Sequence, residues 1–176
     1  MFYYFIINPS SSSGKHKTLW REIKEQLEKE EINYKIAATK KTGDAKRLAR
    51  EASLQVSETN PCTIVAIGGD GTVNEVVNGL ILSPFLSFGY IPTGSGNDLA
   101  RGLGLSKEPL EALAFILHPK EKKAVRIGKI VTKDNEEEEG EKRRFIISSG
   151  AGFDAAVCHH SIQSKIKNML NFLHFG

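Results

Sequence analysis

The chain has 176 residues, of which 40% are hydrophobic and 26% charged, so it is long enough and apolar enough to bury a core of normal size. Its 24 basic and 21 acidic residues leave a net charge of +3, which is too balanced to indicate a nucleic-acid-binding protein. No apolar run is long enough to span a bilayer, so we expect any contact with lipid to be peripheral.

The two cysteines, Cys62 and Cys158, lie in no Cys-x-x-Cys or Cys/His ligand pattern. Sequence alone leaves open whether they form a disulfide. Unpatterned thiols in a chain without a signal peptide favour a reducing compartment, so we expect a cytoplasmic protein.

Short apolar runs alternate with helical periodicity through the first two thirds of the chain. In chain order, the sequence predicts a strand at 2–7, a Ser-rich loop at 10–14, a helix around 20–27, a strand at 34–38, a helix at 45–56, a strand at 63–67, a helix at 73–80, a strand at 85–91, and helices at 97–103 and 109–117. Repeated strand–helix units predict an α/β fold with a Rossmann-like parallel sheet and helices on both faces.

The pattern changes at residue 124. Strands are expected at 125–132 and 144–148, with the acidic run 134–141 as a solvated hairpin loop. Residues 161–175 then predict a basic amphipathic helix. Its apolar stripe either packs on its own domain or supports a homodimer or membrane-surface contact.

The segment Gly68, Gly69, Asp70, Gly71 and Thr72 follows a buried strand directly and opens a helix. Glycines allow a sharp turn and close approach of a ligand, and a helix N-terminus offers free amides and the positive end of its dipole to a phosphate. In this interpretation, Asp70 holds Mg²⁺ or orients a hydroxyl group. The alternative is a tight turn in which Asp70 or Thr72 only caps the helix.

A second glycine segment, with Ser95 between Gly94 and Gly96, also lies between a strand and a helix, which Asn97 and Asp98 can cap. Both turns should leave the same edge of the sheet, where ligands of open α/β sheets bind. Neither segment matches the P-loop or the dinucleotide fingerprint, so those two sites are disfavoured.

Five segments together resemble the diacylglycerol kinase and sphingosine kinase family, of the bacterial lipid kinase type: NPSSSSG (8–14), TKKTGDA (39–45), GGDGTVNEVVNG (68–79), PTGSGNDLAR (92–101) and GAGFDAAV (150–157). NAD kinases share this core, and phosphofructokinases share it more distantly. The G-N-D-L-A-R and G-F-D-A elements favour the lipid-kinase branch.

The resemblance implies that residues 1–123 form a nucleotide-binding α/β domain and that 124–176 are the incomplete start of a β-rich, lipid-side domain. Glu75 is either a nucleotide ligand or a favourable charge near a helix N-terminus. Asp70 is the catalytic candidate within this chain, and metal ligands are not identified. The implied nucleotide-binding residues are Asn8, Thr39, Gly68, Gly69, Asp70, Gly71, Thr72, Glu75 and Ser95.

The implied activity is transfer of the γ-phosphoryl group of ATP, with Mg²⁺, to the hydroxyl of diacylglycerol or a similar lipid. Such chemistry needs positioning and charge neutralisation more than covalent catalysis. In the family, the main catalytic acidic residue lies in an Asp-Gly-Glu context, which would fall beyond Gly176, so we expect a fragment of the active site. The alternatives are a nucleotide-binding module without turnover and a NAD kinase relative with a soluble substrate.

Two further points qualify the resemblance. Arg126 stands where the family usually has an Asp, which reverses a charge at the start of the second domain. Lys15 and Lys17 could add positive charge near the phosphates, but surface lysines are more often only solvated.

Overall fold

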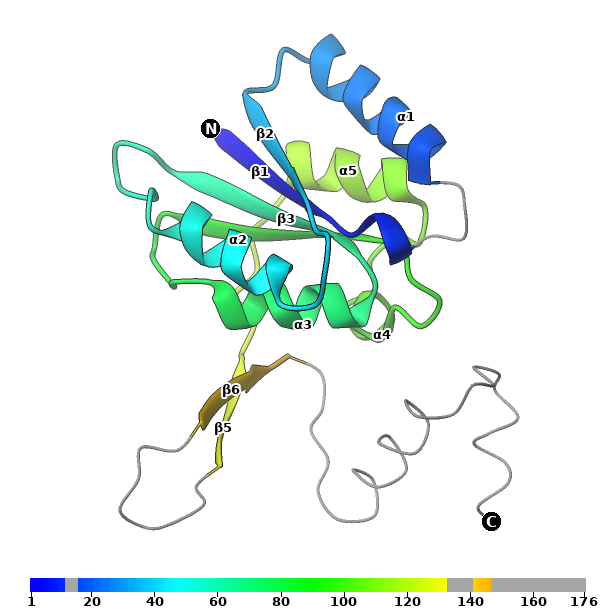
Figure 1. Ribbon diagram of the computed structural model, residues 1–176. Coiled ribbons are helices and arrows are strands. Elements are labelled where there is room, and N and C mark those ends of the chain that lie inside the picture. The colour runs from blue at the N-terminus through cyan, green and yellow to red at the C-terminus, as the bar shows by residue number, and fades with distance from the viewer. Residues whose placement is uncertain (12–15, 133–140, 147–176) are drawn as a thin grey trace, which may run out of the picture.

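A four-stranded parallel sheet with helices on both faces forms the body of the protein, shown as a computed structural model in Figure 1. The structure describes residues 1–11, 16–132 and 141–146. The strand order is β2-β1-β3-β4, so β1 and β3 lie at the centre of the sheet. Its strands are β1 (Phe2–Ile7), β2 (Tyr34–Ala38), β3 (Cys62–Gly68) and β4 (Leu86–Pro92).

The sheet confirms the prediction of a parallel α/β fold. Every residue of β3 is buried, which is why this strand is a continuous apolar run in the sequence. The register pairs Ile67 with Ile7 on one side and with Ile91 on the other. The carboxyl ends of β1, β3 and β4 therefore lie together at one edge of the sheet.

Two helical layers cover the two faces of the sheet (Figure 1). One layer contains α2 (Asp44–Ser53) and α3 (Asp70–Gly79), and the other contains α1 (His16–Lys29) and α5 (Pro109–Leu117). The shorter elements are η1 (Pro9–Ser11) and α4 (Asp98–Gly102). Helix α2 ends at Ser53, earlier than predicted, although Val56 still packs against the core.

Alternate residues of β3 serve the two cores, as the period of a strand requires. Ile64 and Ala66 pack with α2 and α3, whereas Val65 and Ile67 pack with α1 and α5. Gly79 lets α3 approach α2 closely, because a Cβ atom there would overlap the backbone of Lys46. This contact fixes the position of α3, whose N-terminus follows β3 directly.

The second sheet corrects two predicted boundaries. Strands β5 (Gly128–Thr132) and β6 (Glu141–Phe145) form an antiparallel pair, so β5 starts three residues later than expected and β6 starts inside the predicted acidic loop. The ring of Phe145 packs over Gly128, in the space that a Cβ atom at residue 128 would take. The first three residues of β6 are exposed and charged, so no apolar run marks this strand in the sequence.

Strand β6 is attached to the C-terminal end of α3. The Arg144 amide donates to Asn78 Oδ1 (2.8 Å), and Asn78 Nδ2 donates to the Arg144 carbonyl (2.9 Å). The Arg144 guanidinium also donates to the carbonyls of Val77 (3.1 Å) and Leu80 (2.6 Å). A cation is favourable there, because the last carbonyls of a helix lack partners and carry the negative end of its dipole.

Several predictions concern residues outside those described, among them the helix at 161–175, Cys158 and Lys15.

Cys62 is a buried free thiol, and burial raises its pKa. The domain boundary at residue 123 stays a prediction. Across the three described ranges, none of the helices has the length and apolar character needed to cross a membrane.

Candidate functional site

An open cleft of about 390 Å³ lies at the carboxyl ends of β1, β3 and β4. Its volume falls within the range of small-molecule sites. The lining comes from three chain segments: Asn8, Ser10 and Ser11 after β1; Gly69, Asp70, Gly71 and Thr72 after β3; and Gly94, Ser95 and Gly96 after β4. Sequence reasoning predicted both glycine segments at this edge of the sheet.

The first glycine turn joins β3 directly to α3. Gly69 is the N-cap residue of α3, and within the described residues no side chain caps this helix. The alternative in which Asp70 or Thr72 caps α3 is therefore wrong. The first amides of a helix have no intrahelical acceptor, and the dipole adds positive potential. Since residues 69–72 line the cleft, this end of α3 is suited to an anion.

Asn8 and Thr72 lie in contact across the cleft floor. Asn8 Nδ2 donates to Thr72 Oγ1 (3.1 Å), while Asn8 Oδ1 accepts from the Ser10 amide (3.0 Å). Thr72 is buried, and a Cβ atom on Gly68 would overlap its side chain. The hydrogen bond therefore ties the segment after β1 to the first turn of α3.

The two glycine turns touch each other. A Cβ atom built on Gly94 would lie 2.5 Å from the Gly69 Cα, and one built on Gly69 would lie 3.2 Å from the Gly94 Cα. Ser11 and Thr93 add a hydroxyl–hydroxyl hydrogen bond of 2.9 Å beside this contact. The turns are thus adjacent, as the sequence predicted, and no side chain separates them.

Asp70 belongs to the first turn, and its carboxylate lies beside the second. Its Oδ1 accepts from the Leu99 amide in a long hydrogen bond of 3.4 Å, and a Cβ atom on Gly96 would lie 2.9 Å from its Oδ2. In the described part of the chain, no cluster of three or more His, Cys, Asp or Glu residues forms a metal site. Mg²⁺ commonly uses one or two carboxylates together with substrate phosphates and water, and a single carboxylate beside a helix N-terminus that suits an anion fits that mode.

Three of the predicted nucleotide-binding residues, Thr39, Gly68 and Glu75, lie outside the cleft lining, and the Gly68 carbonyl accepts from the Thr93 amide (2.9 Å). Both carboxylate oxygens of Glu75 accept from amides at the start of α2, from Gly43 (2.9 Å) and Ala45 (3.1 Å). Thr39 follows β2 at the same edge of the sheet, with its amide bonded to the Ile7 carbonyl (2.8 Å). Glu75 thus stabilises the start of a neighbouring helix, and both of its carboxylate oxygens are used in doing so.

Lys17 and Arg126 are exposed, and neither lines the cleft. Lys17 therefore gives no support for a phosphate contact in this structure.

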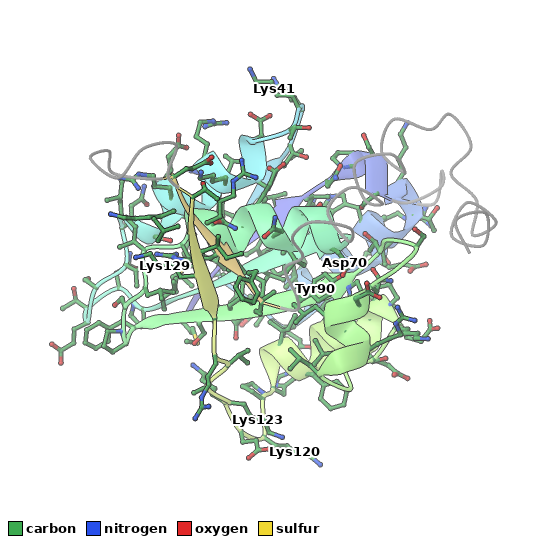
Figure 2. All side chains as sticks on the ribbon, turned by 90° about the horizontal axis from the view of Figure 1, so that it is seen from below. Lys41, Asp70, Tyr90, Lys120, Lys123 and Lys129 are labelled. Atoms are coloured by element: carbon green, nitrogen blue, oxygen red, sulfur yellow. The ribbon has the colours of Figure 1, made fainter. Side chains whose placement is uncertain are left out.

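Tyr90 is a residue of the site that sequence reasoning missed. It is buried on β4, and its hydroxyl donates to Asn97 Oδ1 (3.1 Å) and makes a longer contact with the Gly68 carbonyl (3.4 Å). Burial raises the pKa of Tyr90 strongly, and the negative charges of Asp70 and Asp98 raise it further. Figure 2 shows Tyr90 and Asp70 in the same central region. The available signal was a tyrosine in an apolar strand just before a glycine turn.

Comparison with known proteins gives one family. A family model described as the diacylglycerol kinase catalytic domain matches residues 3–130. The chain is 31% identical over 169 residues to a diacylglycerol kinase of Bacillus subtilis (strain 168), covering 96% of this chain and 51% of that protein. It is 33% identical over 166 residues to a diacylglycerol kinase of Staphylococcus carnosus (strain TM300), covering 94% and 49%.

The fold comparison agrees. A crystal structure of a diacylglycerol kinase from Bacillus anthracis str. Sterne is similar with a TM-score of 0.57 and 30% identity, covering 73% of this chain and 45% of that one. The chain spans about half the length of the curated relatives it matches.

Proposed function

The chain belongs to the diacylglycerol kinase catalytic domain family, and from that premise we propose that its cleft binds the phosphates of ATP for transfer to a lipid hydroxyl. The observation that carries the proposal is the direct contact of two glycine turns beside the uncapped N-terminus of α3. Backbone amides gathered in such a place favour a polyphosphate, because they supply donors and positive potential without side-chain bulk.

The proposed phosphate contacts come from residues 69–72 at the start of α3 and from Ser95 on the turn after β4, all of which line the cleft. Gly68 is proposed to act through the turn that it begins. Asn8 adds an amide side chain, which Thr72 and the Ser10 amide hold in place. Thr39 is proposed as a more distant nucleotide contact at the end of β2. Glu75 is left out of the phosphate contacts, because both its oxygens are bonded at the start of α2.

Asp70 is the proposed Mg²⁺ ligand within this chain, since its carboxylate lies at the junction of both turns. When bound, Mg²⁺ supplies charge neutralisation on the phosphoryl group that is transferred. The residues of this chain would position the nucleotide and keep its terminal phosphate at the open side of the cleft. No acid or base for the acceptor is proposed among the described residues.

The acceptor is proposed to be diacylglycerol or a similar hydroxylated lipid, so that the product would enter phospholipid biosynthesis. Because the chain spans about half of its relatives' length, we propose for it the nucleotide side of the reaction. A cytoplasmic location with peripheral membrane contact is part of this proposal. A homodimer stays a prediction.

Calorimetric titration with Mg-ATP, together with a phosphorylation assay on diacylglycerol vesicles, tests the proposal. We expect saturable binding of Mg-ATP at one site and a rise in melting temperature with ligand concentration. Binding without turnover would support a nucleotide-binding module, and phosphorylation of NAD instead of lipid would support a NAD kinase relative. No binding of any nucleotide would contradict the assignment of the cleft.

A further inference from the structure

A tyrosine hydroxyl lies directly beneath the place where the two glycine turns meet. Tyr90 is 4% exposed, and its hydroxyl reaches Asn97 on the second turn (3.1 Å) and the Gly68 carbonyl before the first (3.4 Å). A buried hydroxyl is costly unless it is hydrogen-bonded. Here one partner is the last residue of β3, directly before the first turn, and the other lies on the second turn, with the shorter of the two bonds going to Asn97.

Asn97 has an unusual conformation for a residue before a helix. Its backbone is left-handed (φ 54°, ψ 46°), and its side chain makes no capping hydrogen bond to α4. Instead Oδ1 accepts from the Gly94 amide (3.1 Å), while Nδ2 donates to the Gly94 carbonyl (2.7 Å). The expectation that Asn97 caps the helix is therefore wrong, because its side chain closes the turn onto Gly94.

These contacts determine that the Tyr90 hydroxyl is the donor in its hydrogen bond to Asn97. Since Gly94 offers one donor and one acceptor, the orientation of the Asn97 amide is determined, and Oδ1 must face Tyr90. Tyr90 then donates its proton to an oxygen that already accepts from Gly94. The hydroxyl thus restrains the side chain that holds Gly94, and Gly94 in turn contacts Gly69.

We propose that Tyr90 and Asn97 form a positioning pair that holds the second glycine turn against the first in the geometry that binds phosphate. The inference rests on the proposed function, because it assigns residues that act on the same site. Neither residue lines the cleft, so both act through the backbone of residues 94–96. A turn that is already in its binding conformation binds more tightly, because less of the binding free energy is lost in ordering it.

The first experiment removes only the hydroxyl. We expect Tyr90→Phe to weaken Mg-ATP binding by roughly 3- to 10-fold, the equivalent of one lost hydrogen bond. The titration is run well below the melting temperature, so that global destabilisation does not change the measured Kd. Tyr34→Phe is the matched control, since Tyr34 lies on the edge strand β2 and packs edge-on against Phe5. We expect it to bind like the unchanged chain.

Amide hydrogen exchange without nucleotide gives a second readout, one that stays valid if Mg-ATP does not bind at all. We expect faster exchange at Gly94 and Gly96 in Tyr90→Phe and unchanged exchange in the body of the sheet. If the unchanged chain fails to bind, the proposed function fails while this readout still tests the pair. Unchanged affinity together with unchanged exchange at residues 94–97 would overturn the inference.

A double-mutant cycle tests whether the hydroxyl acts through Asn97. Asn97→Gly removes the side chain but keeps a residue that tolerates the left-handed backbone. If the two residues act as a pair, Tyr90→Phe should have little further effect in the Asn97→Gly background. Additive losses in Mg-ATP affinity would show that the hydroxyl acts independently, and the pair would be rejected.

Discussion

A Cβ atom on Gly94 would lie 2.5 Å from the Cα of Gly69, so the backbones of these two residues are in direct contact. Real Cβ atoms do not approach backbone this closely. The two turns can therefore keep their present separation only if residue 94 is glycine. The same contact places the backbone amides that follow β3 next to the turn that follows β4.

Gly94→Ala should force the two turns apart. We expect a loss of roughly 1–3 kcal/mol in the free energy of unfolding, as for other overpacked sites, together with loss of Mg-ATP binding. Gly102→Ala is the control, because a Cβ atom on this helical glycine meets no atom within 4 Å. Urea denaturation and calorimetric titration of both variants check the prediction. Wild-type binding by Gly94→Ala would contradict it.

Gly71→Ala should distinguish an effect on the stability of the fold from an effect on ligand binding. Gly71 lines the cleft in the first turn of α3, and a Cβ atom there meets no atom within 4 Å. We expect unchanged or slightly raised stability, by up to about 1 kcal/mol, because alanine favours a helix. If phosphate occupies this space, Mg-ATP affinity should fall by about 10-fold or more, about 1.4 kcal/mol. Equal affinity in titration would place the phosphates elsewhere.

Asp70→Asn tests the proposed metal ligand. The amide keeps the shape of the side chain and can still accept from the Leu99 amide, so we expect the melting temperature to change little. Affinity for Mg-ATP should fall toward the affinity for ATP measured in the presence of a chelator, since the carboxylate charge is lost. Glu111→Gln, on α5 and outside the cleft, serves as the control. A variant that keeps its full magnesium dependence would exclude Asp70 as a ligand.

Glu75→Ala decides between the two interpretations of Glu75. We expect the loss of two hydrogen bonds at the start of α2 to cost about 1–2 kcal/mol of unfolding free energy. The affinity for Mg-ATP should change less than in Gly71→Ala. If affinity is lost while the urea midpoint stays the same, Glu75 is a ligand after all.

Asp44 should make the stability depend on pH at the acid end. The Lys40 amide, with help from the Lys41 amide and from Arg47, holds the pKa of Asp44 below its usual value. The stabilisation is therefore present above the pKa of the unfolded chain and is lost as pH falls through the lower, folded-state pKa. Urea denaturation of the unchanged chain and of Asp44→Asn between about pH 6 and pH 3 should show a flatter acid dependence in the variant. Parallel curves would contradict this role.

The sequence predicted the sheet and the adjacency of the glycine turns because both depend on local patterns. A buried strand such as β3 is largely apolar in sequence, and a glycine pair at its end predicts a sharp turn into the next helix. The ribbon of β5 and β6 was placed less well, because it is solvated and its residues follow no apolar pattern. There, the antiparallel pairing of the two strands sets the boundaries.

Tertiary contacts explain the remaining differences in the site. The position of Glu75 depends on the close approach of α2 to α3 at Gly79, which no periodicity in the sequence encodes. Tyr90 has the sequence signature of a core residue, and only the folded turn brings Asn97 within reach of its hydroxyl. The binding roles of the nine candidate residues stay predictions until a nucleotide is titrated.

Helix α3 has the cleft at its first turn and the Asn78–Arg144 hydrogen bonds at its last. Its ten residues span about 15 Å, so this one helix joins the two contacts. A displacement of α3 as a unit would move both of these contacts. If ribbon placement and nucleotide binding are coupled through α3, a molecule that favours one placement of the ribbon changes nucleotide affinity by the same factor by which the nucleotide changes the affinity for that molecule, because linkage is reciprocal.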